Sequence, residues 1–209
     1  MNREQMVELR ERIVLAGKAS KKFLRLAERL DPEHRNEKKY WITDDTIKTG
    51  ATAVVDWEVL QGLIDKRKPE VIVELGTWFG TSAYAMVNMA CAHVFHPIVH
   101  TCDWHDVFLC DRQYAGHVRF YNERSTRMLK ALHVAGQRCD FAFVDARMKG
   151  DDAQLLCKLF RGKILIAFHD YNTKGGDNIA KVRKIKPDLR LLKPQALNPE
   201  SSIAVLEEV

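Results

Sequence analysis

Residues 71–83 read Val-Ile-Val-Glu-Leu-Gly-Thr-Trp-Phe-Gly-Thr-Ser-Ala, and this stretch decides the fold. Its first part, 71–75, is an apolar run of the length of a buried strand. A turn bounded by two glycines, 76–80, follows at once, and Thr81 or Ser82 can cap the helix that comes next. A strand, a glycine turn and a helix N-terminus in this order bring the backbone close to a nucleotide-like ligand.

Strands and helices alternate after this stretch. Apolar runs predict further strands at 97–102, 118–121, 140–145 and 163–168, and helical patterns lie between them at about 81–91, 107–116, 125–135 and 151–160. A basic helix at about 177–185 and two strands, 189–192 and 202–206, complete the pattern. The alternation predicts an α/β fold, with a Rossmann-like, seven-stranded, mostly parallel sheet that ends in a C-terminal antiparallel hairpin.

Two helices are predicted before the first strand. Residues 3–30 place apolar side chains at helical spacing until Asp31-Pro32, and 54–64 repeats the pattern. The polar stretch between them is a connector or a lid. We therefore expect an N-terminal helical extension or lid at 1–49 and one cofactor-binding domain at 50–209.

The composition is that of a globular protein with 46% hydrophobic and 29% charged residues. No apolar run approaches the roughly 18 residues of a membrane span, and the N-terminus lacks an apolar signal core. Five cysteines without a CxxC pair indicate reduced thiols. These features predict a cytoplasmic protein with no membrane partner.

The net charge of +5 is concentrated in one segment. Residues 174–193 contain seven Lys and Arg against two Asp. This segment could dock an anionic substrate or a nucleic acid, but a solvated helix and loop face is the favoured interpretation.

Four predicted strands end in an acid at the same rim of the sheet: Glu74, Asp103, Asp145 and Asp170. Glu74 suits a cationic or hydroxyl-bearing ligand better than a phosphate, which indicates S-adenosylmethionine (SAM). Asp103 stands near the offset from the glycine turn at which an acid accepts ribose hydroxyls, and Trp104 beside it could stack on an adenine.

Asp145 and Asp170 are candidates for chemistry. They follow adjacent strands, which lie ~5 Å apart, so they could share a hard divalent cation such as Mg²⁺. Alternatively, one acid caps a helix and the other pairs with a nearby cation. His169 and Lys149 are candidate bases for an acceptor hydroxyl. The histidines and cysteines of 93–110 fit no recognised zinc spacing.

These motifs resemble those of class I SAM-dependent methyltransferases, of the branch related to catechol- and caffeoyl-CoA-type O-methyltransferases. The resemblance rests on four segments: 71–82, Cys102-Asp103, 140–146 and 167–171. It covers about residues 50–209. It implies that Glu74, Gly76, Gly80 and Ser82 surround the methionine part of SAM, with Thr77 as a further cofactor-binding candidate. It also implies that Asp103 holds the ribose, that Ser125 lies near the adenine, and that Asp145 and Asp170 match magnesium-binding positions.

Three positions depart from the pattern of that branch. Trp78 replaces the middle glycine of the common turn. Met148 stands where many relatives have a lysine or histidine, with Lys149 one step later. Tyr171 separates Asp170 from the asparagine that directly follows it in metal-dependent enzymes. The motifs therefore support the cofactor fold more strongly than the metal or the base.

The sequence predicts an enzyme that methylates a hydroxyl of a small-molecule or sugar acceptor with SAM, with a divalent metal as an option. One alternative is an RNA or other nucleic-acid methyltransferase that uses 174–193. Another is a SAM-binding module without catalysis, which the departures at Met148 and Tyr171 favour. An NAD-linked oxidoreductase fits less well, because the turn lacks the second glycine that admits a pyrophosphate. The acceptor site would come from 32–56 and 104–112, and the 3–30 helix could mediate a homodimer.

Overall fold

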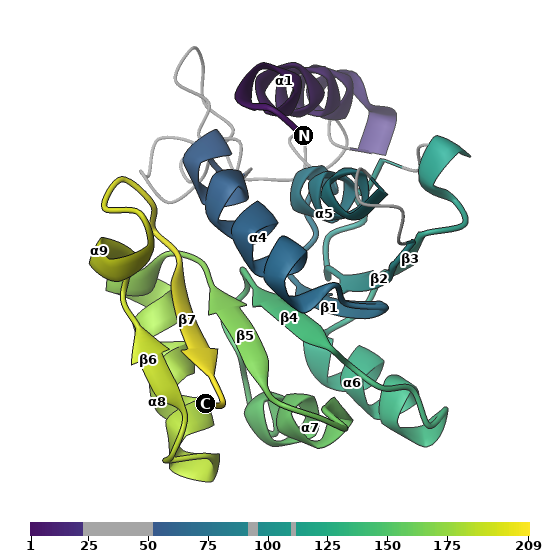
Figure 1. Cartoon of the computed structure of the whole chain (residues 1–209). Coiled ribbons are helices and arrows are strands. Elements are labelled where there is room, and N and C mark those ends of the chain that lie inside the picture. The colour runs from purple at the N-terminus through teal and green to yellow at the C-terminus, as the bar shows by residue number, and fades with distance from the viewer. Residues whose placement is uncertain (23–51, 92–95, 110–111) are drawn as a thin grey trace, which may run out of the picture.

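The computed structural model describes residues 1–22, 52–91, 96–109 and 112–209 (Figure 1). Its strands are β1 (Val71–Leu75), β2 (Ile98–Cys102), β3 (Val118–Tyr121), β4 (Phe141–Val144), β5 (Leu165–Phe168), β6 (Arg190–Leu192) and β7 (Ala204–Glu207). Its α-helices are α1 (Arg3–Ala19), α4 (Val54–Arg67), α5 (Thr81–Cys91), α6 (Ser125–Val134), α7 (Asp152–Leu159), α8 (Gly176–Ile185) and α9 (Pro194–Leu197). The short turns are η1 (Arg112–Tyr114) and η2 (Tyr171–Gly175). The predictions for 23–30 and 32–49 lie outside the described residues.

The strands form one seven-stranded sheet in the order β3-β2-β1-β4-β5-β7-β6. Strands β1 to β5 are parallel to one another, while β7 is antiparallel to both β5 and β6. This arrangement confirms the predicted sheet and its C-terminal hairpin. All seven strands lie within two or three residues of their predicted bounds, because each is a short apolar run between turn residues.

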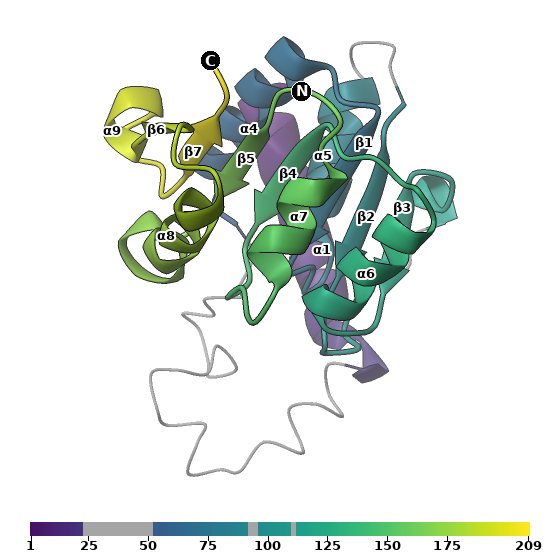
Figure 2. The ribbon, with the colours of Figure 1, turned by 90° about the horizontal axis from the view of Figure 1, so that it is seen from below.

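Helices cover both faces of the sheet (Figures 1 and 2). One apolar core joins α1, α4 and α5 to Ile72, Phe143 and their neighbours in the sheet. The other core contains Val73, Val144 and the apolar faces of α6, α7 and α8. Consecutive strand residues thus face opposite layers, as a sheet buried on both sides requires.

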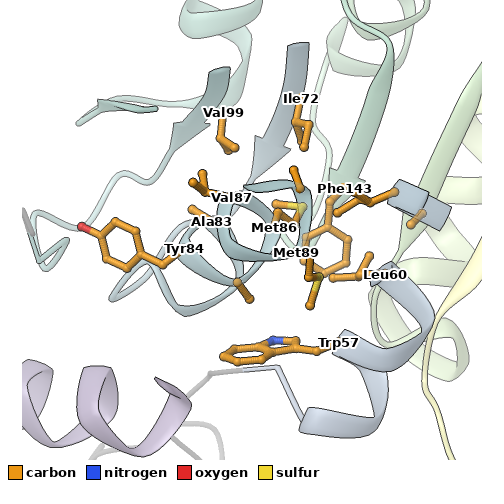
Figure 3. Packing of buried hydrophobic residues seen from close by; sticks show 14 of the residues in the cluster. Trp57, Leu60, Ile72, Ala83, Tyr84, Met86, Val87, Met89, Val99 and Phe143 are labelled. Carbon is orange, nitrogen blue, oxygen red and sulfur yellow. The ribbon is translucent and has the colours of Figure 1, made fainter. Parts of the chain in front are cut away.

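Helix α5 is enclosed by protein along most of its surface, as nine of its eleven residues are buried. Figure 3 shows Met86 and Met89 of α5 between sheet residues such as Phe143 and the α4 side chains Trp57 and Leu60. Helix α1 packs on the same core through Met6, Leu9 and Ile13. The first described helix therefore shares a core with the rest of the chain, and the predicted domain boundary near 49 stays a prediction.

The structure corrects two predicted helices. Among its described residues, the 107–116 segment contains the 3₁₀ turn η1 and no α-helix, because Val107 and Phe108 are buried in the core and this packing overrides the local helical pattern. The predicted 3–30 helix is interrupted at Ser20, which adopts an extended backbone and donates its N–H to the Gly17 carbonyl at 3.1 Å, while Lys21 and Lys22 are helical again. Within the described residues, no helix combines the length and the apolar composition needed to cross a bilayer.

Gly76 and Gly62 offer a matched test of the turn after β1. Gly76 has φ +101°, and an added Cβ would lie 3.0 Å from backbone atoms of Asp145 and Ala146. We expect Gly76→Ala to lower the free energy of unfolding by about 2–4 kcal/mol through strain and overpacking. Gly62→Ala lies inside α4 with open space around the new Cβ, so it should raise that energy by about 0.5–1 kcal/mol. Urea denaturation of both variants checks this; equal effects would contradict it.

Candidate functional site

The candidate site lies at the rim formed by the carboxyl ends of the parallel strands. The sheet register aligns the last residues of β1, β2, β4 and β5: Leu75 pairs with Cys102 and Val144, and Val144 pairs with Phe168. The residues that follow are therefore neighbours across the sheet. These residues are Gly76, Asp103, Asp145 and His169. The rim that the sequence predicted from four strand ends is present.

Glu74 is fully buried beneath this rim. Its two carboxyl oxygens accept hydrogen bonds from the hydroxyls of Ser82, at the start of α5, and Thr101, in β2. Thr101 also contacts the hydroxyl of Thr77. Burial raises the pKa of Glu74 to about 8, although both hydroxyl donors lower it. Glu74 therefore holds a proton at neutral pH and joins the turn, α5 and β2 into one hydroxyl-lined floor.

We expect the raised pKa of Glu74 to make stability depend on pH. The folded state binds this proton more tightly than the unfolded state, so stability falls as pH rises from about 4.5 to about 8. Glu74→Gln keeps the shape but cannot ionise. Urea denaturation of both proteins at several pH values between 5 and 9 should show the wild type losing up to about 1.4 kcal/mol per pH unit relative to Glu74→Gln. Parallel curves for the two proteins would contradict this prediction.

The glycine turn is folded against Asp103. The Asp103 carboxylate accepts the backbone N–H of Trp78 at 3.0 Å and that of His105 at 2.9 Å. Trp78 takes a left-handed backbone with φ +48°, so the residue that replaces the usual glycine adopts a conformation that glycine favours. Gly80 also has a positive φ, and an added Cβ there would lie 2.7 Å from the Phe108 ring. The turn thus keeps its tight geometry without its middle glycine.

Trp104 stands beside this turn with its ring in solvent. It is 70% exposed and lies 4.2 Å, between ring centroids, from His105. Burial raises the pKa of the neighbouring Asp103, while the N–H groups of His105 and Trp78 oppose that rise. An exposed aromatic face and a half-buried carboxylate therefore lie side by side at the end of β2, as a ribose and an adenine would need.

Ser125 is held by an acid that the sequence analysis missed. Its hydroxyl donates to Asp152 at 2.6 Å, and Asp152 also accepts the hydroxyl of Thr126 and the backbone N–H of Lys149 at 2.8 Å. Asp152 is fully buried at the start of α7. It therefore joins the first turn of α6 to the loop after β4. An acid in the first turn of a predicted helix was the signal available for it.

His169 is the centre of a charged cluster at the ends of β4 and β5. Its Nδ1 lies 2.7 Å from Asp145 Oδ1 and 3.4 Å from Asp170 Oδ1, and its Nε2 lies 3.1 Å from Asp56 Oδ2. Asp56 comes from the first turn of α4 and is buried. It also accepts the hydroxyl of Ser201 at 2.7 Å. No sequence signal pointed to Asp56, because an acid near a helix start is ordinarily a solvent-facing residue.

Lys174 is the second cation of this cluster. Its Nζ lies 2.8 Å from Asp145 Oδ1 and 3.2 Å from Asp170 Oδ2. In the sequence, Lys174 is the first residue of the basic 174–193 segment, for which no role at the rim was predicted. The spacing of four residues from Asp170 was the only signal for the contact, and it acts here through the π-helical turn η2.

The pKa shifts in the cluster follow from these contacts. Burial alone would lower the pKa of His169, but the charge of Asp145 and hydrogen bonds to all three acids raise it to about 12. The hydrogen bond from His169, helped by Lys174, holds the pKa of Asp170 well below its usual range. Burial would lower the pKa of Lys174, yet Asp145 and Asp170 raise it. His169 and Lys174 are therefore both cations at neutral pH.

Asp145, His169 and Asp170 bring three possible metal donors within 4.8 Å of one another. Two carboxylates are donors that Mg²⁺ prefers. However, the ammonium of Lys174 already lies on both carboxylates, and a protonated imidazole has no lone pair for a metal. The residues as placed therefore do not fit a divalent cation, although the donor types do.

The loop after β4 separates the other predicted residues from this cluster. Lys149 is exposed, and its backbone N–H is used by Asp152. Met148 is buried, with its N–H donated to Asn178 at 2.9 Å and its carbonyl accepting from Lys181 at 2.5 Å. The structure thus brings Asp145, His169 and Asp170 together, while the described contact of Lys149 is with Asp152 and not with these three residues.

The family model of a methyltransferase domain matches residues 73–171, the segment from β1 to the residue after Asp170. No curated protein sequence matches the chain significantly.

Solved structures share the fold at low sequence identity. The O-methyltransferase TomG from Streptomyces achromogenes, in complex with SAM, is 19% identical with a TM-score of 0.58, over 76% of this chain and 81% of that chain. An O-methyltransferase from Bacillus cereus, in complex with S-adenosylhomocysteine (SAH), is 14% identical with a TM-score of 0.59, over 96% and 91%. The protein cmcI, with magnesium and SAM, is 11% identical with a TM-score of 0.57, over 86% and 85%. These likenesses and the family match confirm the predicted fold and resemblance.

Proposed function

From the match of residues 73–171 to a methyltransferase domain, we propose that the chain transfers a methyl group from SAM to a hydroxyl of a small-molecule or sugar acceptor. The observation that carries the proposal is the rim itself: Glu74, Asp103 and the glycine turn lie together where open α/β sheets bind ligands. Structural neighbours with SAM, SAH or magnesium in their sites support it.

The proposed cofactor site follows the first two strands. Asp103 accepts the ribose hydroxyls, and Trp104 stacks on the adenine from its exposed position. Ser125, at the start of α6, is the residue proposed to lie near the adenine. The methionine part of SAM lies over the β1 turn and the start of α5. The residues proposed for it are Glu74, Gly76, Thr77, Gly80 and Ser82.

The proposed reaction is an in-line displacement. The acceptor oxygen forms a bond to the methyl carbon, the carbon–sulfur bond breaks with its electron pair left on sulfur, and the hydroxyl proton passes to a base. We propose Asp145 as that base, because His169 already holds its proton and orients the Asp145 carboxylate. Exposed Lys149 is the second candidate base.

The proposed acceptor is a small molecule in a cytoplasmic setting. The four described cysteines, Cys91, Cys102, Cys139 and Cys157, are free thiols, and burial raises the pKa of each, which fits a reducing compartment.

We propose the 1–49 extension as a cover over the acceptor site. A homodimer through the outer face of α1, where Leu15 is exposed, is the accompanying proposal for assembly.

A nucleic-acid acceptor is less well supported by the basic segment. Lys174 contacts Asp145 and Asp170, Lys181 donates to the Met148 carbonyl, and Arg190 pairs with Glu207. Three of the seven basic residues are thus engaged within the chain. The other four basic residues are exposed on α8, at its C-cap and after β6, which is the ordinary solvated arrangement: Arg183, Lys184, Lys186 and Lys193.

Calorimetric titration of the purified chain with SAM, SAH and NAD tests the proposal. Micromolar binding of the two adenosyl compounds, with no binding of NAD, is expected. Methyl transfer from labelled SAM to a panel of phenols, sugars and RNA then identifies the acceptor class. Preference for NAD, or no binding of either adenosyl compound, would overturn the methyltransferase assignment. Binding without transfer to any acceptor would favour a SAM-binding module instead.

A further inference from the structure

Lys174 reaches the acidic rim because the backbone of η2 directs it there. Asp170 has a left-handed backbone with φ +54°, and the N–H groups of Thr173 and Gly175 both donate to its carbonyl, at 2.9 and 3.0 Å. A Cβ on Gly175 would lie 2.4 Å from the His169 carbonyl, so glycine is needed at this position. The turn therefore folds back on the end of β5 and presents the residue before Gly175 to the strand ends.

The ammonium of Lys174 lies between the two carboxylates that would hold a metal. Its Nζ contacts Asp145 Oδ1 at 2.8 Å and Asp170 Oδ2 at 3.2 Å, and these acids follow adjacent strands. A Mg²⁺ ion would need the same oxygens at about 2.1 Å. The ammonium and a metal ion would thus compete for the same lone pairs, and their charges would repel each other.

We propose that Lys174 is the built-in cation of this site: its ammonium occupies the divalent-metal position between Asp145 and Asp170, and its removal opens that position to a metal. The lysine side chain is partly exposed, at 26%, and so is that of Asp170, at 42%, so the pair faces the open side of the rim. The ammonium there supplies positive charge beside the acceptor oxygen, a role that rests on the proposed function. The metal-binding part of the proposal does not depend on it.

The proposal predicts that metal affinity is gained when Lys174 is lost. Lys174→Met keeps the apolar stem but leaves the negative charge of Asp145 and Asp170 without its ammonium. The probe is Mn²⁺ alone, titrated into the full chain and followed by the electron paramagnetic resonance signal of the free ion. We expect the wild type to bind Mn²⁺ no tighter than millimolar at this site. Lys174→Met should bind one Mn²⁺ per chain at least tenfold more tightly.

Three further proteins make the test specific. Lys184→Met removes an exposed lysine of α8 and should leave Mn²⁺ affinity at the wild-type value. Lys174→Arg keeps a cation and should also show no gain. Asp170→Asn combined with Lys174→Met should lose the gained affinity, because one of the two carboxylates is gone.

Micromolar Mn²⁺ binding by the wild type would overturn the proposal, even if Lys174→Met fails to fold. Equal affinity in the wild type and Lys174→Met, or a gain that survives Asp170→Asn, would overturn it as well. SAM titration of the same samples separates this result from the proposed function. Suppose that the wild type does not bind SAM, while Lys174→Met binds Mn²⁺ more tightly than the wild type. This result would refute the proposed methyltransferase function and still support Lys174 as the built-in cation.

Discussion

Asp103→Ala is expected to weaken SAM binding by at least about 100-fold. A carboxylate that accepts two ribose hydroxyls makes two charge-assisted hydrogen bonds, each of about 1.5–3 kcal/mol, and 1.4 kcal/mol corresponds to a factor of ten. The same carboxylate holds the N–H groups of Trp78 and His105, so its loss also loosens the turn against which the cofactor would lie. Calorimetric titration with SAM and SAH measures the change.

Asp106→Ala is the matched control for this prediction. Asp106 lies three residues away, is half exposed and pairs with Lys22 at 2.6 Å. Its removal should change SAM affinity less than threefold. Asp103→Asn keeps a side-chain oxygen that can accept one backbone N–H. Its SAM affinity should therefore lie between those of Asp103→Ala and Asp106→Ala. Retention of wild-type affinity by a folded Asp103→Ala protein would show that the ribose is held elsewhere.

His169→Gln is expected to lower the free energy of unfolding by about 3–5 kcal/mol at pH 7. The variant leaves Asp56 and Asp145 facing each other without the cation between them, and an unpaired charge inside a protein carries a cost of this size. Asp56 is buried on α4, so the loss should also loosen the contact between α4 and the end of β5. Urea denaturation followed by far-ultraviolet circular dichroism measures the change.

The pH dependence of this effect has a definite sign. The pKa of His169 rises from 6.5 when unfolded to about 12 when folded, so its contribution is complete below pH 6.5 and declines as pH rises towards 12. The gap in stability between wild type and His169→Gln should therefore narrow from pH 7 to pH 10. His133→Gln, an exposed histidine in the last turn of α6, should show no such gap. A gap that widens with pH would refute the charged state of His169.

The sheet and its acidic rim could be predicted because both follow from local patterns. Short apolar runs bounded by turn residues give strands, and parallel strands send their carboxyl ends to one edge. Asp145 and Asp170 were therefore expected as neighbours from their positions after β4 and β5 alone. The turn after β1 could also be predicted from the sequence, because Gly76 and Gly80 stand at its two positions where φ is strongly positive.

The contacts that the sequence could not predict come from irregular backbone and from distant elements. Lys174 reaches Asp145 through a π-turn, which has no repeating side-chain pattern to detect. Asp56 meets His169 across 113 residues of chain, and helical periodicity carries no information about such pairs. The 107–116 segment looked helical by composition, but burial of Phe108 overrode that local preference.

The position of β7 has a consequence for how this molecule folds. The last strand in sequence lies between β5 and β6, and the segment before it supplies Ser201 and Ser202 to Asp56, about 145 residues away. Contacts between such distant segments form slowly, because a long loop must close before any of them is gained. During synthesis on a ribosome, strands β1 to β5 can assemble before the segment with Ser201 and Ser202, whose hydroxyls contact Asp56, has been made. We therefore expect the hydrogen bonds between Asp56 and these two serines to form late in folding.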